Sequence, residues 1–564
     1  MEEIIPYLQS FYTKEAIEKI VKELKVYYEK LPKVPLQLFS KNWYKDSNLY
    51  LVYPDSIKTD HEVPLKSLRS HLTHVKELGC NAVHILPFLA SPMRDKGYDV
   101  SDYYKIREGL GKKEDLKELK NEADRLGIHL FMDLIFNHVS IDHEWFVKAQ
   151  KGDVYYRDFF IHSQETPQYL GKVEKEDGLY AQYMVNGEKT LVSLAFPEGP
   201  GQLPHWTQGK DGFWYYHTFY SHQIDVNWKN PEVFIAYAKI LLYWTSFGFH
   251  FRFDAIPFIG KAAYKHLNTH NPFTHHLTEV LNVLAKQVNP NCIFILEVNE
   301  ELRSDIEYFG TSNIHQARML YNFQLSAYLW ATLIDKNADH LWKQLKKDRE
   351  IPAHAQWINF LRNHDELSLA VLPKVLQAKV YKKLLPNGKP FSEGFDLGGR
   401  TYSLLGGDEK HFLMSYFLLS SLPGGLLIPY GDDYGMENIK ISELSLDERA
   451  DARNINRGKL TNKIIKSKKG QHIFYQMSQI LIMRQLLRNY LNIWPVKIID
   501  EKGIFGAKYS LGTSELVIFI NLTKHTKSIN FELGSFVEIT SLNLINVFSN
   551  KIKLGPYSGA WLQK

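Results

Sequence analysis

The sequence predicts an α/β protein with a (β/α)8 barrel, a subdomain inserted after the third barrel strand, and an all-β domain at the C-terminal end. Short apolar runs alternate with amphipathic helical segments along most of the chain, which is the pattern of βαβ units in a parallel sheet. Eight such runs fall between residues 49 and 430. The alternation is interrupted once, at 140–222, and gives way to short strands alone beyond about residue 495.

The predicted elements follow one another in a regular order. A helix capped by Thr13 and ended by Pro32 leads into the barrel. The eight predicted barrel strands are Leu49–Tyr53, Ala82–Phe88, Ile128–Phe136, Phe249–Asp254, Cys292–Val298, Met319–Phe323, Trp357–His364 and Leu426–Tyr430. The helices predicted with most detail are Leu65–Leu78, Glu114–Leu126, a helix from Asn230 to Gly248, and Ile473–Leu487. The strands predicted after the barrel are Gly503–Leu511, Leu516–Leu522 and Ser528–Leu533.

The interruption at 140–222 is long, aromatic and polar, with little helical periodicity. A segment of this kind inside a compact domain is usually functional. We therefore expect four parts. They are a helical lead-in at 1–40, the barrel at 41–139 and 223–490, the inserted subdomain at 140–222, and a β-sandwich domain at 491–564.

Composition excludes several classes of protein. The chain has 68 Lys and Arg against 63 Asp and Glu, a net charge of +5 over 564 residues. A charge this mild argues against nucleic acid or a membrane surface as a partner. No run of about 18 apolar residues appears, and the chain starts with acidic residues where a signal peptide would be basic. Two cysteines, Cys80 and Cys292, are too few for a disulfide framework, so we expect a soluble, cytoplasmic protein.

Side chains that can carry charge lie at the ends of several predicted strands. Asp254 ends one strand two residues after Arg252, Glu297 lies at the end of the next, and His364-Asp365 follows a later one. The carboxyl ends of barrel strands meet at one rim, where such folds keep their chemistry. One carboxylate that attacks an anomeric carbon and a second that protonates the leaving oxygen form the minimal set for retaining glycoside cleavage. A third can hold sugar hydroxyls in the transition state, and the imidazoles of His138 and His364 can donate to them.

Four stretches carry a resemblance to a known family. Asp-Leu-Ile-Phe-Asn-His, Phe-His-Phe-Arg-Phe-Asp-Ala, Ile-Leu-Glu-Val and Leu-Arg-Asn-His-Asp occur in this order. They resemble the four signature regions of the α-amylase family (glycoside hydrolase family 13). The resemblance implies Asp254 as nucleophile, Glu297 as acid/base and Asp365 as transition-state stabiliser. It also implies that Arg252, His138 and His364 contact the substrate site.

Further stretches resemble two different branches of that family. Two segments resemble those of sucrose phosphorylases and glucosylglycerate phosphorylases. They are Asp254-Ala-Ile and the segment from Arg453 to Arg457. That branch implies a pair of Asp95 with Arg453 at the closed end of a glucose pocket, with Tyr98 stacked on the sugar ring. Arg457 is an equal candidate for this pair.

The second branch is indicated by two other stretches. Leu361-Arg-Asn-His-Asp-Glu-Leu is closer to trehalose synthases, and Gly97-Tyr-Asp-Val-Ser-Asp is also the α-glucosidase and trehalose synthase form. Asp99, in the latter, is either a residue of the site mouth or a turn carboxylate. No residue set indicates a phosphate site.

A required metal or cofactor is not expected. Many family members hold Ca²⁺ through an Asn equivalent to Asn137, and others through an Asp-x-Asn-x-Asp-Gly loop. Asp46-Ser-Asn48 begins that loop pattern but continues without the next ligand or the glycine. Lys261 is expected to support the site rather than to react, and Asp133 to be structural.

The expected function is retaining cleavage or transfer of an α-linked glucosyl unit from a small saccharide, with a sucrose-type donor favoured. The acceptor is left open among water, inorganic phosphate and a second sugar. The alternative is a trehalose synthase-like enzyme, an α-glucosidase or an α-amylase acting on maltose or α-1,4-glucans. A sugar-binding or scaffold protein on an inactive barrel is the remaining hypothesis. Such chains lack the catalytic carboxylates, which are all present here.

Overall fold

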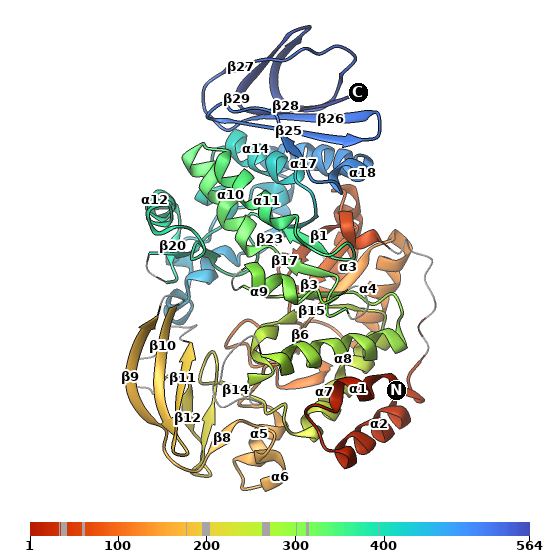
Figure 1. Cartoon of the computed structure of the whole chain (residues 1–564), viewed down its shortest axis with the longest axis vertical. Helices are drawn as coiled ribbons and strands as arrows, with labels where there is room; N and C mark the ends of the chain where they lie inside the picture. Colours follow the sequence, from red (N-terminus) through yellow and green to blue (C-terminus); the bar gives the residue numbers. More distant parts are fainter. Residues whose placement is uncertain are drawn as a thin grey trace. The chain divides into compact units, whose positions relative to one another are not determined.

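The computed structural model describes residues 1–32, 34, 42–58, 63–175, 178–193, 204–261, 271–299, 302–311, 315–392 and 394–564. Figure 1 draws the chain with its elements labelled. Packing divides the chain into two units. Unit 1 is Met1–Lys41, Ile85–Lys120 and Leu130–Leu320, and unit 2 is Asn42–His84, Asn121–His129 and Tyr321–Lys564. The predicted domain boundaries stay predictions, and the one at residues 40 and 41 lies outside the described residues.

Eight parallel strands close into a barrel, in the order β1-β22-β18-β17-β16-β15-β6-β3, which confirms the predicted fold. In chain order they are β1 (Asn48–Val52), β3 (Ala82–Ile85), β6 (His129–Ile135), β15 (His250–Asp254), β16 (Phe294–Leu296), β17 (Met319–Tyr321), β18 (Gln356–Asn359) and β22 (Gly425–Pro429). Each overlaps one predicted strand. The burial of nearly every residue in them explains why they read as apolar runs rather than as alternating patterns.

Some strands are shorter than predicted, for local reasons. β3 stops at Ile85, two residues before Pro87, whose nitrogen has no hydrogen to donate to a ladder. β18 stops at Asn359, and the residues that follow it form an irregular segment carrying His364 and Asp365. The charged residues predicted to end this strand therefore belong to a loop.

Helices follow most of the strands. Thr13 accepts a hydrogen bond from the backbone nitrogen of Ala16 and so caps α2, and Asn230 caps α7 in the same way through Glu232. The longer helices are α2 (Lys14–Tyr28), α3 (Pro64–Glu77), α4 (Lys113–Leu126), α7 (Pro231–Ser246), α8 (Pro272–Val288), α10 (Phe323–Asp335), α11 (Asp339–Asp348), α12 (Lys374–Leu384), α14 (Glu409–Ser420) and α17 (Lys468–Leu486). None of the helices in the described ranges has the length and apolar character that crossing a bilayer requires.

The predicted insertion and the residues directly before and after it form small antiparallel sheets. They are β11-β10-β9, β12-β13-β8 and β14-β7. Their bounds are β7 (His138–Ser140), β8 (His162–Ser163), β9 (Gln168–Lys175), β10 (Gly178–Val185), β11 (Glu188–Ser193), β12 (Trp206–Gln208), β13 (Trp214–Tyr216) and β14 (Gln223–Asp225). A cluster around Tyr183, Trp206 and Tyr216 is its core, so many of its aromatic residues serve packing.

The C-terminal region is all-β, as predicted. Its sheet has the order β24-β25-β26-β29-β27, and β28 pairs with β29. Its strands, blue in Figure 1, are β24 (Val496–Lys497), β25 (Ile504–Leu511), β26 (Ser514–Asn521), β27 (Lys527–Asn530), β28 (Val537–Phe548) and β29 (Lys551–Gln563). A core that includes Phe519, Ile552 and Leu562 holds it together.

Candidate active site

The centre of the candidate site in unit 1 is Arg252, in the middle of β15. β15 pairs with β6 so that Arg252 lies opposite Asp133, and Asp254 is on the same side of β15 two residues on. Arg252 Nη1 lies 2.5 Å from Asp133 Oδ1 and 2.9 Å from Asp254 Oδ1. Arg252 Nη2 lies 2.5 Å from Glu297 Oε2. One guanidinium thus joins three carboxylates that the sequence places on three strands.

Burial and charge together fix the state of Arg252. The side chain is 0% exposed, and burial alone would lower its pKa. The carboxylates of Glu297, Asp133 and Asp254, with the ring hydroxyl of Tyr98, instead raise the pKa of Arg252 well above its ordinary range. Arg252 is therefore a permanent cation at the floor of the site. Asp254 and Glu297 keep 12% and 18% of their side chains exposed, so a ligand can reach them.

The residue after Asp254 adds a backbone contact to Glu297. Ala255 has φ +46° and ψ +39°, in the left-handed region that residues other than glycine seldom occupy. In this conformation its N–H donates to Glu297 Oε2 at 3.2 Å. Strained backbone of this kind is found at functional sites, where it aims a group that regular structure would turn away.

Tyr98 and His138 lie beside this cluster. The Tyr98 hydroxyl lies 3.5 Å from Arg252 Nη1, and its ring is 5.7 Å from the guanidinium carbon. His138 Nε2 donates to the Tyr98 carbonyl at 3.1 Å, and its Nδ1 lies 3.2 Å from Asn137 Nδ2. Burial lowers the pKa of His138 to about 4, so the ring is neutral at pH 7. Both nitrogens of His138 have protein neighbours, so in this structure it positions Tyr98.

Asp95 and Asp99 have separate partners. Asp99 accepts from Ser91 Oγ at 2.7 Å and from the backbone nitrogens of Arg94 and Asp95, so it orders the turn before Tyr98. Of the two roles that the sequence left open for Asp99, these contacts are those of a carboxylate that stabilises a turn. Asp95 Oδ2 accepts from Gln223 Nε2 at 2.9 Å. Asp95 lies in unit 1 and Arg453 in unit 2, and their pairing stays a prediction.

Asn137, the expected Ca²⁺ ligand of the family, contacts a lysine. Lys261 Nζ donates to Asn137 Oδ1, to Phe258 O at 2.6 Å and to Asp225, whose Oδ2 lies 2.6 Å away. These oxygens suit a hard cation, but the ammonium already binds all three of them. The residues therefore do not fit Ca²⁺. Burial lowers the pKa of Lys261, and Asp225 opposes that shift.

Two residues of this region were missed by sequence reasoning. Gln223 binds Asp95, and the fully buried Asp225 binds Lys261, Asn137 and both donors of Thr218. Both belong to β14, the strand that directly follows the predicted insertion. The available signal was the short Gln-Ile-Asp-Val alternation just before the barrel resumes.

Unit 2 contains a second charged group, centred on Asp365. Its Oδ2 lies 3.0 Å from His364 Nε2, and its Oδ1 lies 3.3 Å from Arg453 Nη1 and 3.1 Å from Arg457 Nη2. Burial would raise the pKa of Asp365, but His364, Arg453 and Arg457 hold it well below its usual range. Asp451 also binds Arg453, at 2.8 Å. Both arginines left open by the sequence thus contact one predicted catalytic carboxylate.

Comparison with known proteins gives one family and several relatives. Residues 51–383 match the family described as the alpha amylase catalytic domain. The trehalose synthase of Thermus thermophilus is 32% identical over 400 residues, which cover 70% of this chain and 39% of that protein. The trehalose synthase/amylase TreS of Mycolicibacterium smegmatis is 29% identical over 408 residues, covering 71% and 64%. A glucosylglycerate phosphorylase of Spirochaeta thermophila is 27% identical over 327 residues, covering 57% and 50%.

The matched part is thus less than two thirds of the length of each of these relatives. Among solved structures, the α-amylase from H. orenii superimposes with a TM-score of 0.70 at 20% identity, covering 92% of this chain and 99% of that one. At this identity the likeness shows the fold alone.

Proposed function

Because this chain belongs to the α-amylase family, we propose that it moves a single α-linked glucosyl unit between small saccharides with retention of configuration. The family makes it a glycosidase or transglycosylase. The observation that carries the proposal is the contact of Arg252 with both Asp254 and Glu297. Retaining enzymes need two carboxyl groups ~5–5.5 Å apart, and the shared contact with one guanidinium keeps Asp254 and Glu297 close together.

In the proposed first step, Asp254 attacks the anomeric carbon while Glu297 gives a proton to the departing oxygen. Arg252 keeps Asp254 ionised, as a nucleophile must be. Glu297 Oε2 contacts Arg252 and the Ala255 N–H in the free protein, so its carboxyl group must turn toward the leaving oxygen in the complex. In the second step Glu297 takes a proton from the acceptor, which displaces Asp254 and restores the α-configuration.

Asp365 is proposed to bind the sugar hydroxyls next to the anomeric carbon. These contacts strengthen as the ring flattens toward an oxocarbenium ion. A carboxylate with a pKa well below its usual range stays ionised throughout and neither gives nor takes a proton. His364, at 2% exposure, fixes its orientation from one side.

For the substrate, we propose a glucose disaccharide whose glucosyl unit is returned to the freed glucose, as in maltose and trehalose interconversion. The trehalose synthase relatives and the Asn363-His364-Asp365-Glu366 stretch support this choice. The second candidate is a sucrose-type donor with phosphate as acceptor. It is supported by the glucosylglycerate phosphorylase relative and by the Asp254-Ala255-Ile256 stretch.

The test is to incubate the protein with maltose, trehalose and sucrose, each with and without inorganic phosphate, and to identify the products. Trehalose from maltose, unaffected by phosphate, supports the first candidate. Glucose 1-phosphate from sucrose supports the second. Free glucose as the sole product from every donor would reject transfer and leave hydrolysis.

We also propose that the site works without Ca²⁺, because Lys261 already binds the oxygens a calcium ion would need. Dialysis against a Ca²⁺-selective chelator should leave the turnover rate unchanged. A loss of activity restored by added Ca²⁺ would contradict this.

A further inference from the structure

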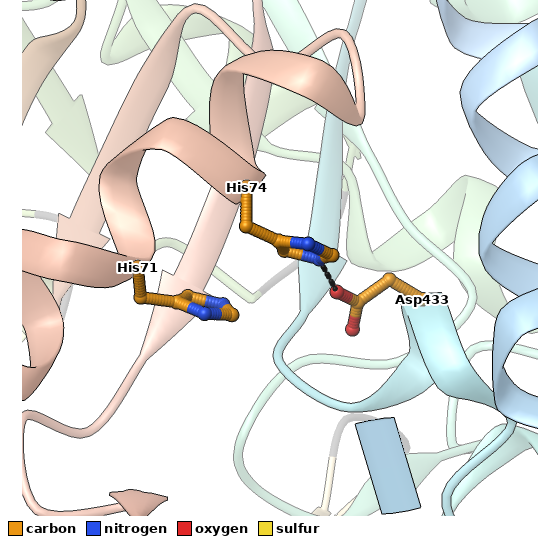
Figure 2. A group of neighbouring side chains, drawn as sticks. All are labelled: His71, His74 and Asp433. Carbon is orange, nitrogen blue, oxygen red and sulfur yellow. Dashed lines mark hydrogen bonds and ion pairs between the residues drawn. The ribbon is translucent and has the colours of Figure 1, made fainter. Parts of the chain in front are cut away.

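His71, His74 and Asp433 form a cluster that the proposed reaction does not use. Their ligand atoms all lie within 4.8 Å of one another. His71 and His74 are three residues apart on α3, so their rings project from the same face of the helix. Asp433 lies in the 3-10 turn Asp432–Tyr434 after β22. Figure 2 shows the two imidazoles neighbouring on α3 and the carboxylate of Asp433 turned toward His74.

We propose that these three side chains bind a zinc ion that ties α3 to the segment after β22. Two imidazoles and one carboxylate are a donor set that Zn²⁺ prefers, whereas Ca²⁺ and Mg²⁺ take oxygen alone. Three protein ligands leave one tetrahedral position, and the 17% exposure of the His74 side chain gives solvent a route to it. The ion would lie next to β1 and β22, the first and last strands of the barrel, which pair directly.

The charge of Asp433 supports a cation at this point. Its side chain is 0% exposed, and a carboxylate buried to that degree needs a charged partner. Within the described part of the chain its partners are the Gly431 N–H at 2.8 Å, the Tyr50 hydroxyl and His74 Nε2 at 2.9 Å. None of these is a permanent cation. A divalent ion between Asp433 and the two imidazoles would neutralise the carboxylate.

The surroundings hold the candidate ligands in place. The Gly431 N–H binds Asp433 Oδ1, and Oδ2 is directed at His74. The Tyr434 hydroxyl lies 2.9 Å from both ring nitrogens of His74, and its ring stacks on the imidazole at 5.0 Å. The Tyr50 hydroxyl lies 3.2 Å from a nitrogen of His71. Outer partners of this kind orient the ligands in known zinc sites.

This departs from the expectation that the chain holds no metal. That expectation concerned the Ca²⁺ positions of the family, whereas the zinc would be structural and would lie behind the barrel wall. Its loss should therefore lower stability rather than abolish turnover. The inference does not depend on which sugar is the substrate.

The experiment uses the full chain without a histidine tag, stripped with a chelator and titrated with zinc sulfate. One zinc ion per chain should bind with a Kd of about 1 μM or tighter by calorimetry, and the Tm should rise by about 2 °C or more. Cobalt in place of zinc should give the visible absorption of a tetrahedral site. Failure to take up one equivalent of zinc would overturn the proposal.

Substitutions of the proposed ligands test whether the zinc ion binds at this cluster. His74→Gln should weaken zinc binding at least about 100-fold and remove the cobalt absorption, because it deletes a ligand while leaving a partly exposed position. His472→Gln is the matched control, since His472 pairs with Glu409 at 3.3 Å and is 53% exposed. Asp433→Asn removes the carboxylate ligand instead of an imidazole and should weaken zinc binding in the same way. Zinc uptake that survives His74→Gln, or that falls equally in His472→Gln, would place the metal elsewhere and refute the site.

Discussion

Two charged groups, one in each unit, contain different ratios of positive to negative side chains. Around Arg252, one buried cation contacts three carboxylates, those of Asp133, Asp254 and Glu297. Around Asp365, one carboxylate contacts two guanidiniums and an imidazole, those of Arg453, Arg457 and His364. In the first group three carboxylates share a single positive charge, whereas in the second Asp365 and Asp451 share two guanidiniums.

The difference in charge between the two groups fits the two roles that the proposed reaction requires, which are bond and proton exchange and charge stabilisation. Two carboxyl groups that form a bond to the sugar and transfer a proton must be able to change their chemical state. A carboxylate that only stabilises charge is most effective when it is held ionised and immobile.

The largest effect is expected from Asp254→Asn. Asn cannot attack the anomeric carbon, so kcat should fall by at least about 10⁴-fold, or about 5.5 kcal/mol in activation free energy. Its amide oxygen can still accept from Arg252, so the Tm should change little. Steady-state rates with maltose and a thermal melt check both parts. Retention of most of the turnover would refute the assignment.

Asp365→Asn should cost less, about 10²–10³-fold in kcat, because it removes a stabilising charge and leaves the nucleophile in place. KM should change less than kcat, since the lost contacts are strongest in the transition state. A loss as large as that of Asp254→Asn, measured under the same conditions, would show that the two groups do not differ in role.

The pH dependence of stability should distinguish His138, which lies beside the Arg252 group, from Asp365. The unfolded chain protonates His138 near pH 6.5, whereas the folded one does so near pH 4, so the free energy of unfolding falls as the pH drops through this window. The loss from His138 is about 3 kcal/mol. The folded-state pKa of Asp365 is well below its usual range, so its contribution is present above about pH 3.9 and lost only below that.

Urea unfolding between pH 4 and pH 7 measures this difference. His138→Gln should flatten the pH dependence in that window, whereas Asp365→Asn should leave its slope unchanged. Equal slopes for the wild-type chain and His138→Gln would mean that His138 does not contribute.

The smallest effect is expected from Arg457→Lys. Lys keeps the positive charge but loses the planar pair of donors, and Arg453 still contacts Asp365. We expect about a tenfold loss of kcat/KM. The double variant Arg453→Lys with Arg457→Lys should lose more than the sum of the two single effects on a free-energy scale, because the second arginine no longer compensates. Strict additivity would argue that only one of them acts through Asp365.

The barrel could be predicted because its strands are buried on both faces and read as apolar runs. The same argument missed β28 and β29. β28 is exposed along much of its length and changes register with β29 at three places, so no clean alternation appears in the sequence. β29 contains Gly555 and Pro556, which interrupt the pattern of a strand.

The grouping of Arg252, Asp254 and Glu297 followed from the rule that strand ends share a rim, and in the structure Arg252 contacts both carboxylates. Gln223 and Asp225 could not be placed in this way, because their position depends on the pairing of β14 with β7, which lies at the other end of the insertion. For the arginines a signal did exist. The segment from Arg453 to Arg457 was singled out by its resemblance to a branch of the family, and in the structure Arg453 lies in the 3-10 helix Ala452–Asn456 with Arg457 as the residue after it.

The most direct test of the account is to trap the covalent intermediate. The Glu297→Gln variant, given α-glucosyl fluoride, whose leaving group needs no proton, should accumulate a glucosyl ester because it cannot activate the acceptor. Digestion and mass spectrometry should then find one added hexosyl group on the peptide that contains Asp254. A hexosyl group on Asp133 or Asp365 instead, or a product released with inverted configuration, would contradict the account.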